Sequence, residues 1–472
     1  MSTESKPSPT FKKDVVSRKK TASYTMGPLI DQITVISYNA LIFYYYEVEL
    51  GLATALVGLS FVIFAIWNMI NDPLIGYLTD KPMPWSKKYG LRTPWIIFGA
   101  VGLIICYYLL FAVPNVGDVK SNPWPLFWYM IIISCLFDTF YTLFNTHWIG
   151  GFANIFRTKE ERRKGSTILT MAVIVGSFFF LGLLIPFTIV FGDPSSYIRY
   201  ALIISITSVI ALVIFIPGIY ENEFVKKRYL QIYEFLEAQR MPFFQFLKTT
   251  LKQKNFVVFL IVWTLVLAAN TLAQISSLYF LREVLKLDLQ VLAYTQFVFL
   301  ITYIPSLIIW SKYAKKTEHV NLMIIGLILT TILRTLAMGI TNLTQIIIIQ
   351  ACSGVAAAAM SCMLLSLIAD TNDEVVDACG RHVEASLGGI RTFFYRISYL
   401  VAGAIIAGVH LATGYVSGAS EQTELAQFGI RLHYTGIGAI FSLIATILMI
   451  KFYDLKGEKK ALLAASLVKK RL

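Results

Sequence analysis

The sequence predicts an all-α integral membrane protein with twelve transmembrane helices in two six-helix halves, and three observations lead to this prediction. Of the 472 residues, 56% are hydrophobic and 15% are charged, whereas an average soluble domain carries about 25% charged residues. Apolar runs such as 95–113, 168–191 and 343–368 approach or exceed the roughly 20 residues that cross a hydrocarbon core. The third observation is the distribution of positive charge along the chain.

The hydropathy pattern places the helices in order. We expect spans at 25–47, 53–79, 93–113, 125–152, 166–191, 198–219, 255–280, 290–310, 320–340, 343–369, 385–411 and 431–453. A long polar segment, 220–254, separates the halves 25–219 and 255–453, and cytosolic tails flank them at 1–24 and 454–472. A division into six and six helices with a long central cytosolic loop is typical of transporters built from two repeats.

Positive charge is strongly asymmetric across the predicted membrane. With the N-terminus in the cytosol, five of the 41 Lys and Arg residues fall in outer loops, three in spans and the other 33 in cytosolic segments. This bias follows the positive-inside rule and predicts that both termini are cytosolic. The net charge of +13 therefore faces anionic lipids at the cytosolic face of what we expect to be the plasma membrane, and does not indicate nucleic-acid binding.

The five cysteines do not indicate a metal centre or a disulfide framework. Four lie inside apolar runs and no CxxC motif occurs, so we interpret them as small packing residues. No structural metal and no cofactor are expected.

Ionisable residues within spans are costly, at roughly 2.5–3.5 kcal/mol on insertion scales, and usually mark a transport pathway. Asp31 and Asp72 lie at similar depths, about 12–13 Å from the cytosolic ends of the first two helices at 1.5 Å per residue. We expect one carboxylate to take up a cation and the other to bind solute hydroxyls or a proton. The alternative is a structural polar contact.

The fourth predicted helix carries a polar stripe. Asp138, Thr142, Asn145 and Trp148 follow one another at spacings that place them on one helical face. Carboxylate, hydroxyl, amide and indole groups can hydrogen-bond and stack against a polyol, although polar packing between helices would give the same pattern.

The eleventh helix carries Arg391 and Arg396, which need a carboxylate, a carbonyl or water because an arginine is not readily neutralised. Snorkelling to the cytosolic face would explain Arg391. Arg396 is too deep for snorkelling, so we expect it to pair with Asp72 or Asp31. We assign both arginines to the candidate solute site, together with Asp31, Asp138, Asn145 and Trp148.

The predicted cytosolic loops carry complementary charge, basic at 157–164 and acidic at 370–377. Ion pairs between the halves would close an inner gate, whereas solvated surface charges would contribute little. The residues assigned to this candidate gate are Asp80, Arg92, Arg162, Arg163, Asp373 and Asp377.

Two segments resemble a known family. The run FYYYEVELGLATALVGLSFVIFAIWNMINDPLIGYLTDK at 43–81, followed by GLRTPW at 90–95, resembles the first helices of glycoside–pentoside–hexuronide:cation symporters of the major facilitator superfamily. The run ADTNDEVVDACGRHVEASLGGIRTFFYRIS at 369–398 is similar to the family's tenth and eleventh helices. The resemblance implies the major facilitator fold and alternating access.

The resemblance also implies roles for individual residues. Asp31 matches a sugar-binding aspartate, while Asp72 and Thr142 match cation-site residues. Asn68 and Asn145 stand where melibiose permease, a member of the family, has a second cation aspartate and a second sugar aspartate. Two further departures are Thr170, which replaces a sugar-site arginine, and Arg396, which replaces a lysine.

These departures shape the expected function. A single carboxylate beside an arginine suits a proton better than sodium, so we expect a monomeric H⁺-coupled symporter of a sugar, glycoside or similar polar solute, with Na⁺ at Asp72 as the alternative. The same fold carrying a lysolipid is the competing interpretation. An intramembrane prenyltransferase-like enzyme, indicated faintly by NDEVVD at 372–377, and a non-transporting sensor are remote alternatives.

Overall fold

The structure is a computed structural model that describes residues 16–79, 83–156, 159–221, 226, 243–380 and 384–470. Within these residues the chain is helical and contains no strand. Eleven helices are long and apolar enough to cross a membrane. Together with the more polar α2, Met26–Tyr44, they account for the twelve predicted spans and confirm the all-α, multi-pass fold.

The helices of the N-terminal half begin and end close to the predicted positions. They are α1 (Arg18–Tyr24), α2, η1 (Tyr45–Glu49), α3 (Thr54–Thr79), α4 (Ser86–Tyr89), α5 (Thr93–Phe111), α6 (Trp124–Ile155), α7 (Lys159–Ser177), η2 (Phe178–Leu184), α8 (Ile185–Thr188) and α9 (Pro194–Ile219).

The C-terminal half follows after α11 (Phe243–Thr250). Its elements are α12 (Lys254–Tyr279), η3 (Phe280–Val284), α13 (Gln290–Tyr313), η4 (Ala314–Lys316), α14 (His319–Ala337), α15 (Leu343–Cys379), α16 (Glu384–Thr413), α17 (Glu424–Arg431), η5 (Leu432–Gly436), α18 (Ile437–Phe452) and α19 (Gly457–Lys470). The segments η1, η2, η3 and η5 are π-helical, and η4 is a 3₁₀ turn.

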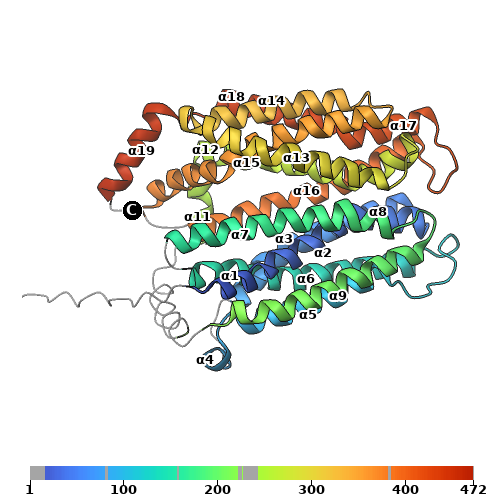
Figure 1. Ribbon diagram of the computed structural model, residues 1–472, viewed down its shortest axis with the longest axis horizontal. Helices are drawn as coiled ribbons and strands as arrows, with labels where there is room; N and C mark the ends of the chain where they lie inside the picture. The colour runs from blue at the N-terminus through green and yellow to red at the C-terminus, as the bar shows by residue number, and fades with distance from the viewer. Residues whose placement is uncertain are drawn as a thin grey trace, which may run out of the picture.

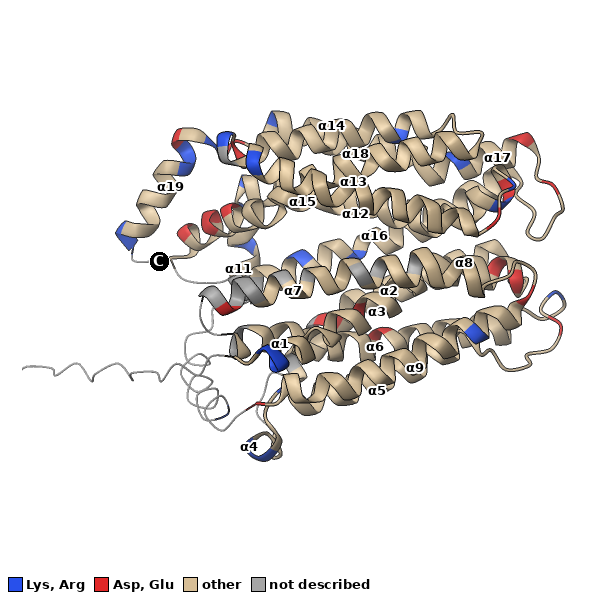
Figure 2. Cartoon of the chain, viewed as in Figure 1, with Lys and Arg blue, Asp and Glu red and all other residues tan. Residues whose placement is uncertain are grey.

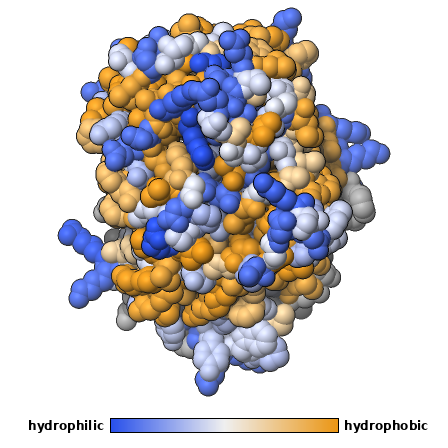
Figure 3. Space-filling model, turned by 90° about the vertical axis from the view of Figure 1, so that its right-hand side faces the viewer, coloured by the Kyte–Doolittle hydropathy of each residue, from blue (hydrophilic) through white to orange (hydrophobic). Residues whose placement is uncertain are grey.

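The two halves lie side by side with their long helices roughly parallel (Figure 1). One end of the molecule carries α4, α11 and α19, and the opposite end carries α8 and α17. We call these the inner end and the outer end, after the orientation predicted from charge. Charged residues gather toward the two ends (Figure 2), and polar side chains spread among apolar ones over the outer end (Figure 3). This separation is expected of a chain that spans a bilayer.

The first membrane-spanning helix of each half, α2 and α12, ends in the same way. The π-helical segments η1 and η3 close with matching bonds, from Leu50 N to Tyr45 O and from Leu285 N to Phe280 O, both 3.0 Å long. Each is followed by a positive φ, 74° at Gly51 and 52° at Lys286, a conformation that is uncommon for a residue other than glycine. The repeated geometry supports an internal repeat of six helices.

The halves approach closely where glycines face the opposite half. A Cβ atom built on Gly58 of α3 would lie 2.4 Å from Ala407 Cβ of α16, and one built on Gly403 would lie 2.5 Å from Phe61 Cβ. Small residues permit this approach of backbones, which is how helices in membranes commonly pack. The contact between α3 and α16 therefore joins the halves through dispersion forces as well as through polar groups.

Two predicted boundaries are corrected by the structure. Part of the expected N-terminal tail forms α1, where Tyr24 is fully buried and Ser23 Oγ donates to Ile214 O over 2.5 Å. The tenth span does not end at 369, because α15 continues as a helix to Cys379. The acidic run 370–377 was expected to be a loop because its charges interrupt the apolar pattern, although helical geometry continues beyond the apolar stretch.

Close packing inside the N-terminal half gives a stability prediction. A Cβ atom on Gly99 of α5 would lie 2.6 Å from the backbone nitrogen of Phe144 in α6, and a backbone atom cannot move aside cheaply. We expect Gly99→Ala to destabilise the protein by on the order of 1–3 kcal/mol, measured as a lower thermal unfolding temperature in detergent. Gly408→Ala is the matched control, because nothing lies within 4 Å of its added Cβ atom; equal losses for the two variants would contradict the prediction.

Candidate cation and solute site

The polar residues of the two halves meet in a cluster formed by α3, α6 and α16. Arg396 Nε donates to Asp72 Oδ2 over 3.1 Å, and Thr142 Oγ1 donates to Asp72 Oδ1 over 2.5 Å. The side chains of Asp72 and Arg396 are each 16% exposed. Of the two partners expected for Arg396, Asp72 and Asp31, the ion pair forms with Asp72, and it links the C-terminal half to the N-terminal half.

A second carboxylate completes this cluster. Asp138 is 2% exposed and accepts two amide hydrogen bonds, from Asn68 Nδ2 at 2.6 Å and from Asn71 Nδ2 at 3.1 Å. Asn71 Nδ2 also lies 3.3 Å from Thr142 Oγ1. The cluster therefore runs continuously from Arg396 through Asp72 and Thr142 to Asp138.

Helical periodicity explains why these groups converge. Asn68, Asn71 and Asp72 stand three and four residues apart on α3, and Asp138 and Thr142 stand four apart on α6, so each set occupies one face. A carboxylate facing lipid would be expensive, and in each helix the polar face turns inward. The sequence analysis did not identify Asn71, although its spacing placed it beside the predicted site residues.

A separate contact joins α2 to α6. Asn145 Nδ2 donates to Asp31 Oδ2 over 3.1 Å, while the buried Asp31 Oδ1 has no hydrogen-bond partner among the described residues. The guanidinium of Arg396 lies 5.7 Å from the centre of the Tyr141 ring, and Tyr141 in turn is close enough to Asp31 to interact electrostatically. Two predicted solute residues thus lie together, next to the cation cluster through Tyr141 and Arg396.

Two other predicted solute residues lie elsewhere. Arg391 is 8% exposed and donates from Nη1 to Asn372 Oδ1 over 2.6 Å, so its guanidinium is held within the C-terminal half. Trp148 packs edge-on against Tyr24, with ring centres 6.4 Å apart, and its indole nitrogen has no partner among the described residues. No contact in the described structure brings either side chain to the carboxylates.

The predicted inner-gate residues have partners within their own halves where the structure describes those partners. Asp377 Oδ1 accepts from Lys470 Nζ over 2.8 Å and from Ser466 Oγ over 2.6 Å, which holds α19 against α15. The backbone nitrogen of Arg92 donates to Glu221 Oε2 over 3.2 Å; burial raises the pKa of this loop carboxyl.

The remaining gate residues give no test of the gate. Asp373 lies on α15 and is exposed. Asp80 lies outside the described residues, as do the side chains of Arg162 and Arg163. Ion pairing across the inner end therefore stays a prediction.

Comparison with known proteins identifies the family. The sequence model of the family described as MFS/sugar transport protein matches residues 23–457. The sodium-dependent lysophosphatidylcholine symporter 1 of Mus musculus is 23% identical over 84% of this chain and 77% of its own. The uncharacterized symporter sll1374 of Synechocystis sp. is 28% identical over 39% of this chain. The chain matches about a third of that relative's length, 34%.

Solved structures show the same fold. The crystal structure of a D-xylose–proton symporter superposes with a TM-score of 0.64 at 13% identity, covering 92% of this chain and 98% of that one. At this identity the likeness concerns the fold alone. The match to the family model across nearly the whole chain confirms the resemblance seen in 43–81 and 369–398, and the chain belongs to the MFS/sugar transport protein family.

Proposed function

We propose that the protein is a secondary active transporter, a cation-coupled symporter that carries a sugar, glycoside or similar polar solute by alternating access. The observation that carries this proposal is the ion pair between Asp72 of α3 and Arg396 of α16. It places a titratable carboxylate on the contact between two halves that must move relative to each other during transport.

Charge balance supports coupling to one monovalent cation. Asp72 and Asp138 contribute two negative charges, and Arg396 contributes one positive charge. The cluster therefore carries one net negative charge when both carboxyls are ionised, and burying an uncompensated charge is costly. One bound H⁺ or Na⁺ neutralises it.

Hydrogen bonding favours the proton. The Asp72 oxygens accept from Thr142 and Arg396, and the Asp138 oxygens accept from two asparagine amides. A sodium ion needs free oxygens, and would require these amides to turn their oxygens toward it, a reorientation that exchanges atoms of similar shape. The buried Asn68 Oδ1, which has no partner among the described residues, would be the first oxygen available to Na⁺.

Neutralising Asp72 also provides a coupling step. Arg396 would lose its carboxylate partner, and the contact between α3 and α16 would weaken. The halves would then be free to rock about the central site, which is how alternating access proceeds in proteins of this architecture. The candidate gate at the inner end would close when the outer end opens.

The solute is proposed to bind between Asp31, Asn145 and Arg396. The unpartnered Asp31 Oδ1 is a free acceptor, and buried polar atoms normally have a partner. A sugar hydroxyl would satisfy it, and the ring of Tyr141 beside it offers an apolar face for stacking. Trp148 and Arg391 remain proposed contacts that would require the helices to move.

A lysolipid is the second candidate solute. The Mus musculus relative, aligned over 84% of this chain, is named a lysophosphatidylcholine symporter, which favours an amphiphile. Competition between a labelled glycoside and lysophosphatidylcholine in one binding assay separates the candidates, and a thermal-shift screen of sugars, glycosides and lysolipids at two pH values selects the ligands for it.

The charge distribution supports a cytosolic location for both termini. We propose that the protein resides in the plasma membrane, with α19 at the cytosolic face near anionic lipids. The exposed Lys469 of this helix would face these lipids. We propose that the transporter acts as a monomer, since both candidate sites are formed by one chain.

Asp72→Asn is expected to abolish concentrative uptake, because an amide cannot exchange a proton or balance Arg396. The measurement is accumulation, in proteoliposomes, of the radiolabelled solute that the thermal-shift screen selects. Asp118→Asn, in an exposed outer loop, is the matched control and should accumulate solute like the wild type. Wild-type accumulation by Asp72→Asn would remove Asp72 from the coupling mechanism.

The coupling ion follows from imposed gradients. We expect a pH gradient, acidic outside, to drive accumulation without sodium, and a sodium gradient at equal pH to drive little. Robust concentrative uptake with the sodium gradient alone would show that the amides reorient and that sodium is the coupling ion.

Arg396→Met should destabilise the protein by on the order of 3–5 kcal/mol, because it leaves buried carboxylates uncompensated. The double variant Asp72→Asn with Arg396→Met should recover most of that loss in thermal unfolding. Arg199→Met breaks an exposed pair, 58% and 39% exposed, and should cost only about 0–1 kcal/mol. A double variant as unstable as Arg396→Met would contradict the pairing.

A further inference from the structure

A second group of titratable side chains lies buried at the outer end, away from the central site. It consists of Glu47 in η1, His410 in α16 and His433 in η5, which are 0%, 1% and 0% exposed. Three of the helices that meet here, through η1, η3 and η5, are π-helical at this end, and such segments occur frequently at functional sites. The sequence analysis did not identify these residues.

Hydrogen bonds connect this group across the two halves. Glu47 Oε1 lies 3.1 Å from His410 Nδ1, and His410 Nε2 lies 3.1 Å from His433 Nε2. His433 Nδ1 then lies 2.6 Å from Ser276 Oγ of α12. Of these four hydrogen-bonded residues, Glu47 alone belongs to the N-terminal half, so the bonds hold the outer ends of the halves together.

Glu47 is also bound by hydroxyl groups from both halves. Thr54 Oγ1 donates to Glu47 Oε1, and the Tyr279 hydroxyl donates to Glu47 Oε2. Ser417 Oγ of the C-terminal half donates to the backbone oxygen of Glu47 over 2.7 Å. Both carboxylate oxygens of Glu47 and its backbone oxygen therefore accept hydrogen bonds.

This hydrogen-bonded chain, from Glu47 through His410 and His433 to Ser276, has two protonation states in which every imidazole nitrogen has a hydrogen-bond partner. With ionised Glu47, His410 donates from Nδ1 and, if neutral, accepts at Nε2 from His433, whose Nδ1 then accepts from Ser276. If one proton is added, His410 donates from both nitrogens, His433 accepts at Nε2, and His433 Nδ1 donates to Ser276 Oγ. Every nitrogen keeps a partner in both states, so the chain can bind a proton without breaking a hydrogen bond.

The two states differ in net charge. Without the extra proton the buried chain carries the single negative charge of Glu47, and with it Glu47⁻ and His410⁺ cancel. Removing a net charge from water is costly, whereas a well-bonded neutral pair costs less. Closing the outer end over this chain therefore favours the state that has taken up the proton.

The surrounding charges act in the same direction. Glu49 of η1 and Glu283 of η3 add two carboxylates, against the guanidinium of Arg282, which lies 3.9 Å and 3.7 Å from them. Lys286 and Glu421, 2.7 Å apart, cancel each other. The other titratable groups here are tyrosines: Tyr44, bound by Arg282, Tyr197, at Glu49, and Tyr415, stacked on His410.

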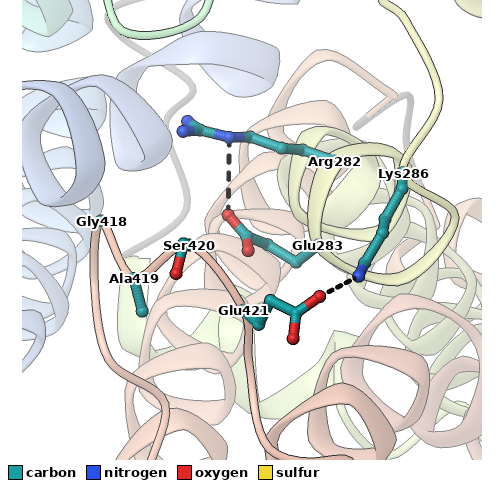
Figure 4. A pocket seen from close by; sticks show the side chains of 7 residues that line it. All are labelled: Arg282, Glu283, Lys286, Gly418, Ala419, Ser420 and Glu421. Carbon is teal, nitrogen blue, oxygen red and sulfur yellow. Dashed lines mark hydrogen bonds and ion pairs between the residues drawn. The ribbon is translucent and has the colours of Figure 1, made fainter.

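A polar pocket leads toward this chain from the outer surface. Figure 4 shows Arg282, Glu283, Lys286 and Glu421 lining it beside the loop 418–421. Glu283 lies close enough to Glu47 and His410 to interact electrostatically. In the proposal below, a proton from the outer solution would enter by way of this carboxylate in the pocket wall.

We propose that Glu47, His410 and His433 form a second proton-binding site, and that the bound proton holds the outer ends of the two halves together. The site is distinct from the cation cluster at Asp72 and does not depend on which ion drives transport. It makes the closed state of the outer end more populated as the outer pH falls.

The test measures the distance between the outer ends directly. Spin labels are placed on Lys120→Cys and Leu425→Cys, one in each half and both exposed, in the full-length protein with its five native cysteines replaced and reconstituted in lipid nanodiscs. Pulsed electron resonance then gives the distance distribution from pH 8 to pH 6. We expect the ratio of the short to the long distance to rise as the pH falls, by up to about tenfold per pH unit, the limit for linkage to one proton.

Two variants identify the groups responsible. Glu47→Gln removes the negative charge and should keep the outer end closed at all of these pH values, whereas His410→Gln cannot take up the proton and should shift the ratio toward the long distance without a pH response. Asp288→Asn, which is exposed and does not line the pocket, is the matched control and should respond like the labelled parent. If Glu47→Gln does not fold, His410→Gln still tests the proposal.

The outcome also separates this site from the central one. A pH response that persists unchanged in Glu47→Gln and in His410→Gln would overturn the proposal and assign the response to the cluster at Asp72. No pH response in the labelled parent would overturn it as well. Loss of the response in these two variants, with Asp72→Asn still responding, would establish the outer site whether or not the proposed symport is correct.

Discussion

The ion pair between Asp72 and Arg396 is the interaction on which the interpretation of this protein depends. It is one of the few contacts in which charged groups of opposite halves meet inside the predicted membrane, and its free energy changes when the carboxyl is neutralised. Packing between α3 and α16 is dispersive and insensitive to ions. The charged pair therefore makes the arrangement of the halves depend on the ions present.

The outer chain at Glu47 repeats this principle with different chemistry. Its buried carboxylate is balanced by a histidine that can gain or lose a proton, whereas Arg396 stays charged. The central pair can respond only through its carboxylate, while the outer group can respond through an imidazole. The contacts Asp72–Arg396 and Glu47–His410, which join the halves at different depths, thus respond to different chemical signals.

Much of this arrangement was predictable from sequence. Apolar runs and the bias of positive charge gave the helices, and the cost of an arginine in hydrocarbon required a partner such as Asp72. The outer group was missed because Glu47 and the histidines sit near the ends of spans, where polar residues are ordinary. Their proximity depends on helix rotation and on the π-helical segments, which hydropathy does not report. The acidic end of α15 was missed because helical geometry can continue past the apolar core.

The matching ends of η1 and η3 have a consequence for the origin of the chain. The tyrosines preceding them, Tyr44 and Tyr279, face each other with ring centres 5.0 Å apart, yet Tyr44 binds Arg282 and Tyr279 binds Glu47. Equivalent places in the repeat thus hold opposite charges. Two identical copies would set like charges against each other there, so this arrangement requires that the two copies differ in sequence at this place.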